Sequence, residues 1–263
     1  MTSSILLLDS MMASKIFIGM YIVQGLFCAV LPAQNNSLYK SNNNSNNVKK
    51  TVDTTSSSTA QIESITTGMG SAQLATGILG YCLIILGLDI HTSLGYMFLI
   101  WSCTTWYKII SANYKKSGGK LSAQVISLIL FSIQIILNLT KHEYALLITQ
   151  IIAVITSLNG ILFIMNPQKG LQSWGTTPSQ SSLASFKCFG YWLLVTTSYT
   201  IMVSSGVNVI KALAYASMFG LTQILSFLFI SREYHSTKVV TAPIGVFYGF
   251  AAVFTVLIAS ILM

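Results

Sequence analysis

Only a few residues of this sequence are of types that could carry out chemistry, and Asp89 and His91 form the most suggestive pair. A carboxylate two residues from an imidazole can act as a proton relay or as one corner of a metal site. Asp89 can equally cap a helix that begins near Thr92, because the free N–H groups at a helix N-terminus favour a nearby anion. We favour capping and treat the pair as interfacial polar candidates.

The other histidines and their neighbouring carboxylates lie at the edges of apolar runs, where solvated charges are expected. They are His142 and Glu143 beside Lys141, and Glu233 and His235 beside Arg232. The sequence has no paired histidines at metal-binding spacing, no nucleophile elbow and no phosphate-binding glycine loop. It therefore predicts no catalytic residue, no metal and no cofactor, and it disfavours an enzyme without excluding one.

Neutral polar residues inside the apolar runs form a third group. Gln150, Asn159 and Gln223 carry amide groups that could line a cavity and bind an uncharged, amphipathic ligand. The same amides could instead hydrogen-bond neighbouring helices, at typically less than about 2 kcal/mol each. No pair of buried acids accompanies them, so coupling to protons or sodium would lack its usual carboxylate.

The elements that must position these residues follow from the composition. Of the 263 residues, 53% are hydrophobic and only 8% are charged. Soluble domains carry about 25% charged residues, because their surface faces water. This chain cannot cover its surface with charge, so lipid must cover it. The 14 basic residues against 6 acidic ones therefore indicate membrane topology and lipid contact rather than nucleic acid.

Apolar runs of about 20 residues, the length that spans a bilayer as a helix, recur along the chain. Backbone groups in lipid must bond within their own segment, which favours helices. The sequence predicts an all-α integral membrane protein with about eight transmembrane helices: 16–33, 72–90, 92–112, 121–140, 144–166, 185–204, 208–230 and 239–262. Residues 1–15 form a short N-terminal segment, and a disordered Asn/Ser/Thr-rich loop is expected at about 35–70.

The sequences at the ends of two apolar runs resemble each other. A constant offset of 135 relates three pairs of residues: Gly25 and Gly160, Pro32 and Pro167, Tyr39 and Trp174. Treating residues 41–65 as an insertion brings Gly80 into step with Gly190. The pattern predicts two tandem four-helix modules in parallel orientation, residues 16–140 and 144–263. Two unrelated helix ends of a common kind are the alternative.

The basic residues predict an orientation. With eight spans, the odd-numbered connections hold eleven of the 14 basic residues. Because basic residues favour the cytoplasmic face, these connections are predicted to be cytoplasmic. One of them carries four lysines that are candidates for binding lipid headgroups: Lys108, Lys115, Lys116 and Lys120.

The first apolar run has a second interpretation. Residues 12–34 resemble a signal peptide, with one lysine, an apolar run and small residues near Ala33. Cleavage there would leave seven spans. It would also place Asn35 and Asn43, which begin Asn-X-Ser glycosylation triplets, on the non-cytoplasmic side. The repeat requires the first helix to be retained.

These features predict a multi-pass membrane protein, non-enzymatic, that binds or transports a small neutral or lipid-like molecule between the two modules. An accessory or assembly subunit, packed against other membrane proteins or further copies of itself, is the first alternative. A lipid-modifying membrane enzyme that uses Asp89 and His91 is the second. Membrane lipids are the expected partners, and nucleic acid is not.

Overall fold

The computed structural model describes residues 2–33, 52–111, 114, 116–173, 180–226, 251 and 254–255. Every regular element among these residues is a helix. The long helices are α1 (Thr2–Val30), α3 (Val52–Gly80), α4 (Ile90–Ile110), α6 (Leu121–Leu139), α7 (Ala145–Met165), α9 (Gln180–Ser204) and α10 (Val209–Leu225). A π-helical turn, η1 (Tyr81–Ile85), continues α3, and the short helix α8 (Pro167–Ser173) follows α7.

Within the described residues, four segments are helical, long and apolar enough to cross a membrane: Ser10–Val30, Thr59–Ile85, Leu121–Leu139 and Ala145–Met165. This agrees with the membrane class predicted from composition, but it is fewer than the eight predicted spans. Helices α4 and α9 are long enough, yet hydroxyl side chains and the lysines Lys108 and Lys187 lower their hydropathy. Helix α10 has only 17 residues. The last predicted span, 239–262, lies almost entirely outside the described residues.

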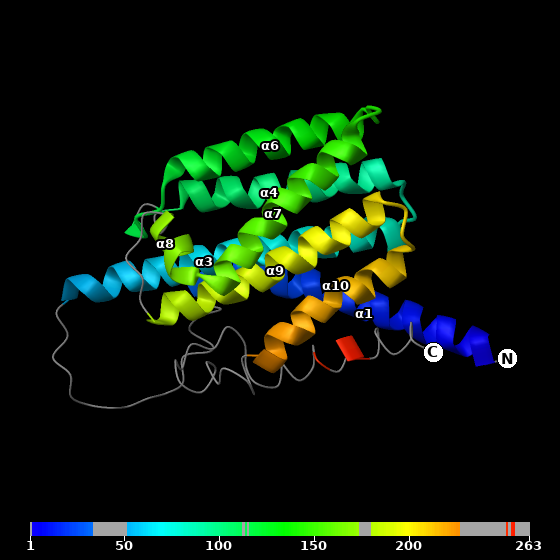
Figure 1. Ribbon diagram of the computed structural model, residues 1–263, viewed down its shortest axis with the longest axis horizontal. Helices are drawn as coiled ribbons and strands as arrows, with labels where there is room; N and C mark the ends of the chain where they lie inside the picture. The colour runs from blue at the N-terminus through cyan, green and yellow to red at the C-terminus, as the bar shows by residue number, and fades with distance from the viewer. Residues whose placement is uncertain are drawn as a thin grey trace.

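The long helices run alternately in opposite directions, with α3 and α9 at the centre of the bundle (Figure 1). Helix α1 packs along α3, and α7 packs along α9. Helix α4 contacts both α3 and α6, while α10 packs on α9. Figure 1 shows α6 at the outer edge of the molecule, beyond α4. Helices α6 and α7 are therefore neighbours in sequence that pack on different partners.

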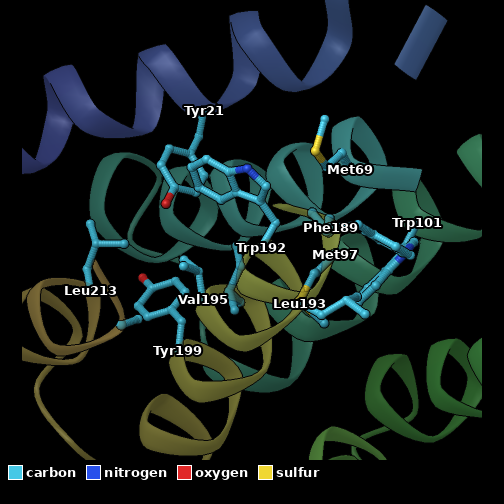
Figure 2. Close-up of a cluster of buried hydrophobic side chains, with 14 of the residues drawn as sticks. Tyr21, Met69, Met97, Trp101, Phe189, Trp192, Leu193, Val195, Tyr199 and Leu213 are labelled. Carbon is cyan, nitrogen blue, oxygen red and sulfur yellow. The ribbon is translucent and has the colours of Figure 1, made fainter. Parts of the chain in front are cut away.

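The core lies where α1, α3, α4, α9 and α10 meet (Figure 2). Tyr21 of α1 and Trp192 of α9 stand edge to face, with ring centroids 5.3 Å apart, an arrangement that aromatic pairs favour. Figure 2 shows a second group, Trp101, Phe189 and Leu193, on the side of the cluster away from Leu213. This second group also faces the cavity described below.

Glycines allow two helix pairs to pack very closely. A Cβ atom at Gly70 would lie 2.6 Å from the carbonyl oxygen of Gly25, and one at Gly190 would lie 2.6 Å from that of Gly160. No carbon side chain tolerates such a distance, so the α1–α3 and α7–α9 pairs require glycine at these contacts. In the structure Gly190 therefore corresponds to Gly70, because each makes the close contact within its helix pair. The comparison of the two sequence stretches had instead aligned Gly190 with Gly80.

The two central helices meet at a pair of threonines. Thr76 Oγ1 of α3 lies 2.8 Å from Thr196 Oγ1 of α9, and the two positions differ by 196 − 76 = 120. Each central helix is followed by a glycine with positive φ and then by a residue that caps the next helix: Gly87 and Asp89 after α3, Gly206 and Asn208 after α9. The α3–α4 and α9–α10 turns therefore have the same local chemistry.

The structure corrects the predicted disordered loop at about 35–70, because α3 begins at Val52. Residues 34–51 lie outside the described part of the chain. In α3 the hydroxyls of Thr66, Thr67 and Ser71 donate to carbonyl oxygens four residues earlier, at 2.8, 3.0 and 2.8 Å. Once bonded to its own helix, a small hydroxyl side chain can be buried, and all three are buried. A polar composition therefore did not prevent packing here.

Candidate ligand cavity between α6 and α7

Helices α6 and α7 form a hairpin whose two arms diverge (Figure 1). Lys141, in the connection between them, has a φ of 53°, the left-handed conformation that helps to close the turn. Beyond the turn, α6 packs against α4 and α7 packs against α9. Because they follow different neighbours, the two helices meet mainly near the turn and separate toward α8 (Figure 1).

A buried polar cluster joins α6 to α7 near the turn. Thr149 Oγ1 donates to Gln134 Oε1 at 2.6 Å, and Asn138 Nδ2 donates to the same oxygen at 3.1 Å. Asn138 Nδ2 also lies 3.2 Å from Thr149 Oγ1, and all three side chains are fully buried. Leaving such a group without a partner costs about 1–3 kcal/mol, so the cluster holds this end of the hairpin together.

An exposed ion pair lies at the same end of the molecule. Lys141 Nζ is 3.2 Å from Asp89 Oδ2, which links the α6–α7 turn to the start of α4. Asp89 also accepts hydrogen bonds from the hydroxyl and the backbone N–H of Thr92, at 2.7 and 3.1 Å. These two bonds to Thr92, and to a smaller extent the bond and charge of Lys141, hold the pKa of the Asp89 carboxyl well below its usual range.

Asp89 is therefore the cap of α4, the interpretation that the sequence analysis favoured. His91 lies in the first turn of α4, at the same end of the helix. Among the described residues there is no group of three or more side chains that could hold a metal ion together.

Away from the turn, α6 and α7 enclose a cavity of about 570 Å³ together with α3, α4, α8 and α9. This lies within the range of about 300–1,000 Å³ that ligand pockets occupy. Its inner wall is aromatic. Trp101 and Phe131 have ring centroids 4.9 Å apart, and Phe163 and Phe189 have centroids 5.8 Å apart. Figure 2 shows Trp101 and Phe189 together at this edge of the core.

The mouth of the cavity is apolar. Ile126 on α6 and Ile155 on α7 line the cavity, yet their side chains are 58% and 54% exposed. Leu130 and Leu162 line it in the same way and are also exposed. In a bundle surrounded by lipid such side chains face acyl chains, so the cavity opens sideways between α6 and α7.

Lys108, in the last turn of α4, brings a charged group into the cavity wall. Its side chain is only 4% exposed. The ammonium lies 5.5 Å from the centre of the Tyr114 ring, within the range of a cation–π contact. It also lies 3.6 Å from the position that a Cβ atom at Gly68 would occupy, so the ammonium packs beside α3.

Hydroxyl groups line the cavity as well, but their protons are already used. Ser71, Thr105 and Thr156 donate to carbonyl oxygens of their own helices at 2.8 Å each, and Ser127 does so at 3.0 Å. These groups therefore present lone pairs to the cavity rather than O–H donors. Side-chain N–H donors on the described wall belong to Lys108, Trp101, Gln124 and Asn159.

The three predicted cavity residues are not brought together. Asn159 lines the cavity, at its exposed edge. Gln150 lies on α7 before the cavity begins, and its amide donates to Ser205 Oγ at 3.2 Å. Gln223 is buried in α10, a helix that contributes no described residue to the cavity wall.

The four lysines predicted to bind headgroups also have different positions. Lys108 is buried in the cavity wall. Lys116 and Lys120 are exposed in the connection after α4, and Lys115 lies outside the described residues. Sequence reasoning missed this role of Lys108. A signal was present, because Trp101, Thr105 and Lys108 follow the i, i+4, i+7 spacing that places residues on one helix face.

No protein-family model, curated protein or solved structure matches this chain. Its function is therefore inferred from the residues of the cavity.

Proposed function

We propose that this protein is a multi-pass membrane protein that binds a small, lipid-like molecule in the cavity between α6 and α7. The observation that carries the proposal is a cavity of about 570 Å³ with exposed apolar side chains around its mouth. A water-soluble ligand would have to pass through lipid to reach such a mouth. A molecule with an alkyl chain is already concentrated in the bilayer at that point.

The chemistry of the wall supports an amphipathic ligand. Aliphatic and aromatic side chains predominate, and the polar groups, which are fewer, come from α3, α4, α6, α7 and α8. This is the composition that small-molecule sites favour, because apolar contact supplies affinity and a few polar groups fix orientation. The aromatic pair Trp101 and Phe131 forms a flat inner surface against which a chain can lie.

The cavity lies where the two proposed tandem modules, residues 16–140 and 144–263, meet. The repeat is supported by the glycine contacts within the α1–α3 and α7–α9 pairs and by the Thr76–Thr196 contact between α3 and α9. In this arrangement α3, α4 and α6 of the first module face α7, α8 and α9 of the second across the cavity. A movement of one module relative to the other would open or close it, as transport requires.

We also propose that the α8 end of the bundle is cytoplasmic. The described basic residues around that end are Lys108, Lys116, Lys120, Lys169 and Lys187, while Lys141 and Lys211 lie at the turns of the opposite end. Basic residues near membrane helices favour the cytoplasmic side. Labelling of single-cysteine variants at these turns in oriented vesicles would test this assignment.

Filling the cavity tests the binding proposal. Ser127→Trp places an indole ring in the cavity from α6, whereas Ile129→Trp adds the same ring at an exposed position that does not line the cavity. The purified full chain in detergent is titrated with monopalmitoylglycerol, a neutral single-chain lipid. Thermal unfolding is measured at each concentration.

We expect the wild type and Ile129→Trp to gain roughly 5–10 °C in Tm at a lipid concentration of about 100 times Kd, because a ligand stabilises the state that binds it. Ser127→Trp should gain little, since the ring occupies the ligand's space. Equal stabilisation of the two variants, or no stabilisation of the wild type, would contradict the proposal.

A further inference from the structure

We infer that the ligand is a single-chain amphiphile with an anionic headgroup, bound by Lys108 while its chain extends between α6 and α7. This inference rests on the proposed binding function and adds the chemical class of the ligand. The sequence suggested a neutral ligand, because the candidate cavity residues carry uncharged amide groups. The structure instead places an ammonium group in the cavity wall.

Polarity changes along the length of the cavity. On α4 the lining residues are Trp101, Thr105 and Lys108. Seven residues of helix separate the Cα atoms of Trp101 and Lys108 along the axis, which is about 10 Å at about 1.5 Å per residue. Lys108 lies at the helix end, and Trp101 lies deeper, where its ring packs against Phe131. An amphiphile fits this gradient with its headgroup at Lys108 and its chain toward the aromatic pair.

The facing helices α6 and α7 carry polar and apolar groups along the cavity. Helix α6 begins where α4 ends, and its lining residues pass from Gln124 to Leu130 with increasing distance from Lys108. Helix α7 runs in the opposite direction, so Asn159 lies nearer the Lys108 end than Ile152 does. Leu162 and Phe163 lie still nearer that end, so apolar side chains line both ends of this face and the change in polarity is that of α4.

The positively charged group in the wall favours an anionic ligand. An anionic headgroup needs N–H or O–H donors, and the protons of Ser71, Thr105 and Thr156 are bonded to backbone carbonyls. The ammonium of Lys108, packed against the face of the Tyr114 ring, brings a positive charge and three N–H groups to the cavity wall. Hydrogen bonds between ionised partners are roughly twice as strong as neutral ones. A carboxylate or a phosphate monoester is therefore favoured over a neutral headgroup.

Binding of matched ligands tests this assignment. Palmitate, lysophosphatidate and monopalmitoylglycerol carry a carboxylate, a phosphate and a neutral headgroup respectively, and acetate supplies the carboxylate without the chain. Affinities are measured by competition against a fluorescent single-chain probe bound to the purified full chain. The variants are Lys108→Met, which keeps side-chain length without charge, and Lys108→Arg, which keeps the charge. Lys116→Met is the matched control, because it removes one positive charge from an exposed site at the same end.

We expect at least one anionic amphiphile to bind about tenfold or more tightly than monopalmitoylglycerol, both to the wild type and to Lys116→Met. The preferred headgroup then distinguishes a fatty acid from a lysophospholipid. The ratio should fall toward one in Lys108→Met and recover in Lys108→Arg. Acetate should not compete, because it lacks the chain; competition by acetate would indicate a simple anion site and overturn the inference.

Two further outcomes separate this inference from the proposed function. Equal affinity of the wild type for charged and neutral amphiphiles would overturn the anionic class and leave the binding function intact. Failure of every amphiphile to bind the wild type would overturn both. If Lys108→Met does not fold, the ratio measured on the wild type and Lys116→Met still decides the question.

Discussion

Helix α7 meets its two neighbours in different ways. Against α9 it approaches so closely that Gly160 and Gly190 leave no space for a Cβ atom. Against α6 it is held near the turn by the cluster of Gln134, Asn138 and Thr149, and beyond that cluster the two helices are separated by the cavity. One face of α7 is thus fixed along its length, and the other is fixed only at one end.

The difference shows how a membrane bundle can combine a rigid part with a part that opens. In lipid, helices are not driven together by the hydrophobic effect, so close van der Waals packing and interhelical hydrogen bonds hold them. The α7–α9 pair combines close packing with hydrogen bonds such as that from Ser157 Oγ to Thr197 Oγ1 at 2.6 Å, whereas the α6–α7 pair relies on hydrogen bonds over a short stretch. Entry of a ligand is therefore expected to move α6 about the polar cluster, with α7 and α9 moving as one unit.

The largest effect on stability is expected from a substitution that disrupts the close contact between α7 and α9. Gly190→Ala would place its Cβ atom 2.6 Å from the backbone oxygen of Gly160, so the two helices must separate. We expect the free energy of unfolding to fall by about 1–3 kcal/mol, as overpacking commonly costs. Unfolding of the purified full chain in mixed detergent micelles measures the change.

Gly19→Ala is the matched control, because a Cβ atom there would have no neighbour within 4 Å. It should leave stability unchanged or raise it by up to about 1 kcal/mol, since alanine is the better helix former. If Gly190→Ala is as stable as Gly19→Ala, then α7 and α9 are not packed as tightly as described, and the comparison between the two faces of α7 fails.

A smaller effect is expected at the closed end of the α6–α7 pair. Thr149→Val removes the hydroxyl that donates to Gln134 Oε1 at 2.6 Å and leaves that oxygen with Asn138 alone. We expect a loss of about 0.5–2 kcal/mol in the free energy of unfolding, the range for interhelical hydrogen bonds in membranes. The same measurement in mixed micelles detects it.

Thr156→Val, on the same helix, is the control for that substitution. Its hydroxyl donates to the carbonyl oxygen of Ile152 within α7 and makes no described bond to α6. Its stability should stay within about 0.5 kcal/mol of the wild type. Equal losses in the two variants would show that valine disturbs α7 itself and that the cluster does not hold the hairpin.

The properties of the fold that could be predicted from the sequence are those that do not depend on how the helices are arranged in space. The membrane class follows from the shortage of charged residues, which holds for any fold. Helices α6 and α7 were placed within one residue at each end, because their apolar runs are bounded by polar turns. The start of α3 was not predicted, because the serines and threonines in its first turns were treated as unable to pack. Their bonds to their own helix make them compatible with the interior.

The site was harder to predict because an apolar helix does not reveal which face is turned inward. Periodicity identifies the inner face of an amphipathic helix, but a helix that is apolar all round gives no such signal. Asn159 lines the cavity, while Gln150 and Gln223, which were chosen by the same reasoning, lie elsewhere. Lys108 is buried because α4 packs against α3, whose Gly68 lies beside the ammonium, and no local pattern indicates that contact.

The smallest effect is expected at the ion pair that links the α6–α7 turn to α4. Asp89→Asn keeps an amide that can cap α4 but removes the charge that pairs with Lys141. Both partners are about half exposed, at 45% and 59%, so we expect a loss of less than about 1 kcal/mol that disappears at high salt. Unfolding of both proteins at low and high salt measures it.

The pH dependence of that loss sharpens the comparison. Because folding lowers the pKa of Asp89 from 3.8, its stabilising effect is present above that pH and is lost as the pH falls from there toward the lowered pKa. The difference in stability between wild type and Asp89→Asn should therefore be constant near about pH 6 and shrink below about pH 4. A difference that persists unchanged in acid and in salt would mean that the charge of Asp89 contributes nothing. The α6–α7 turn would then be held by its buried cluster alone, and the closed end would depend entirely on Gln134, Asn138 and Thr149.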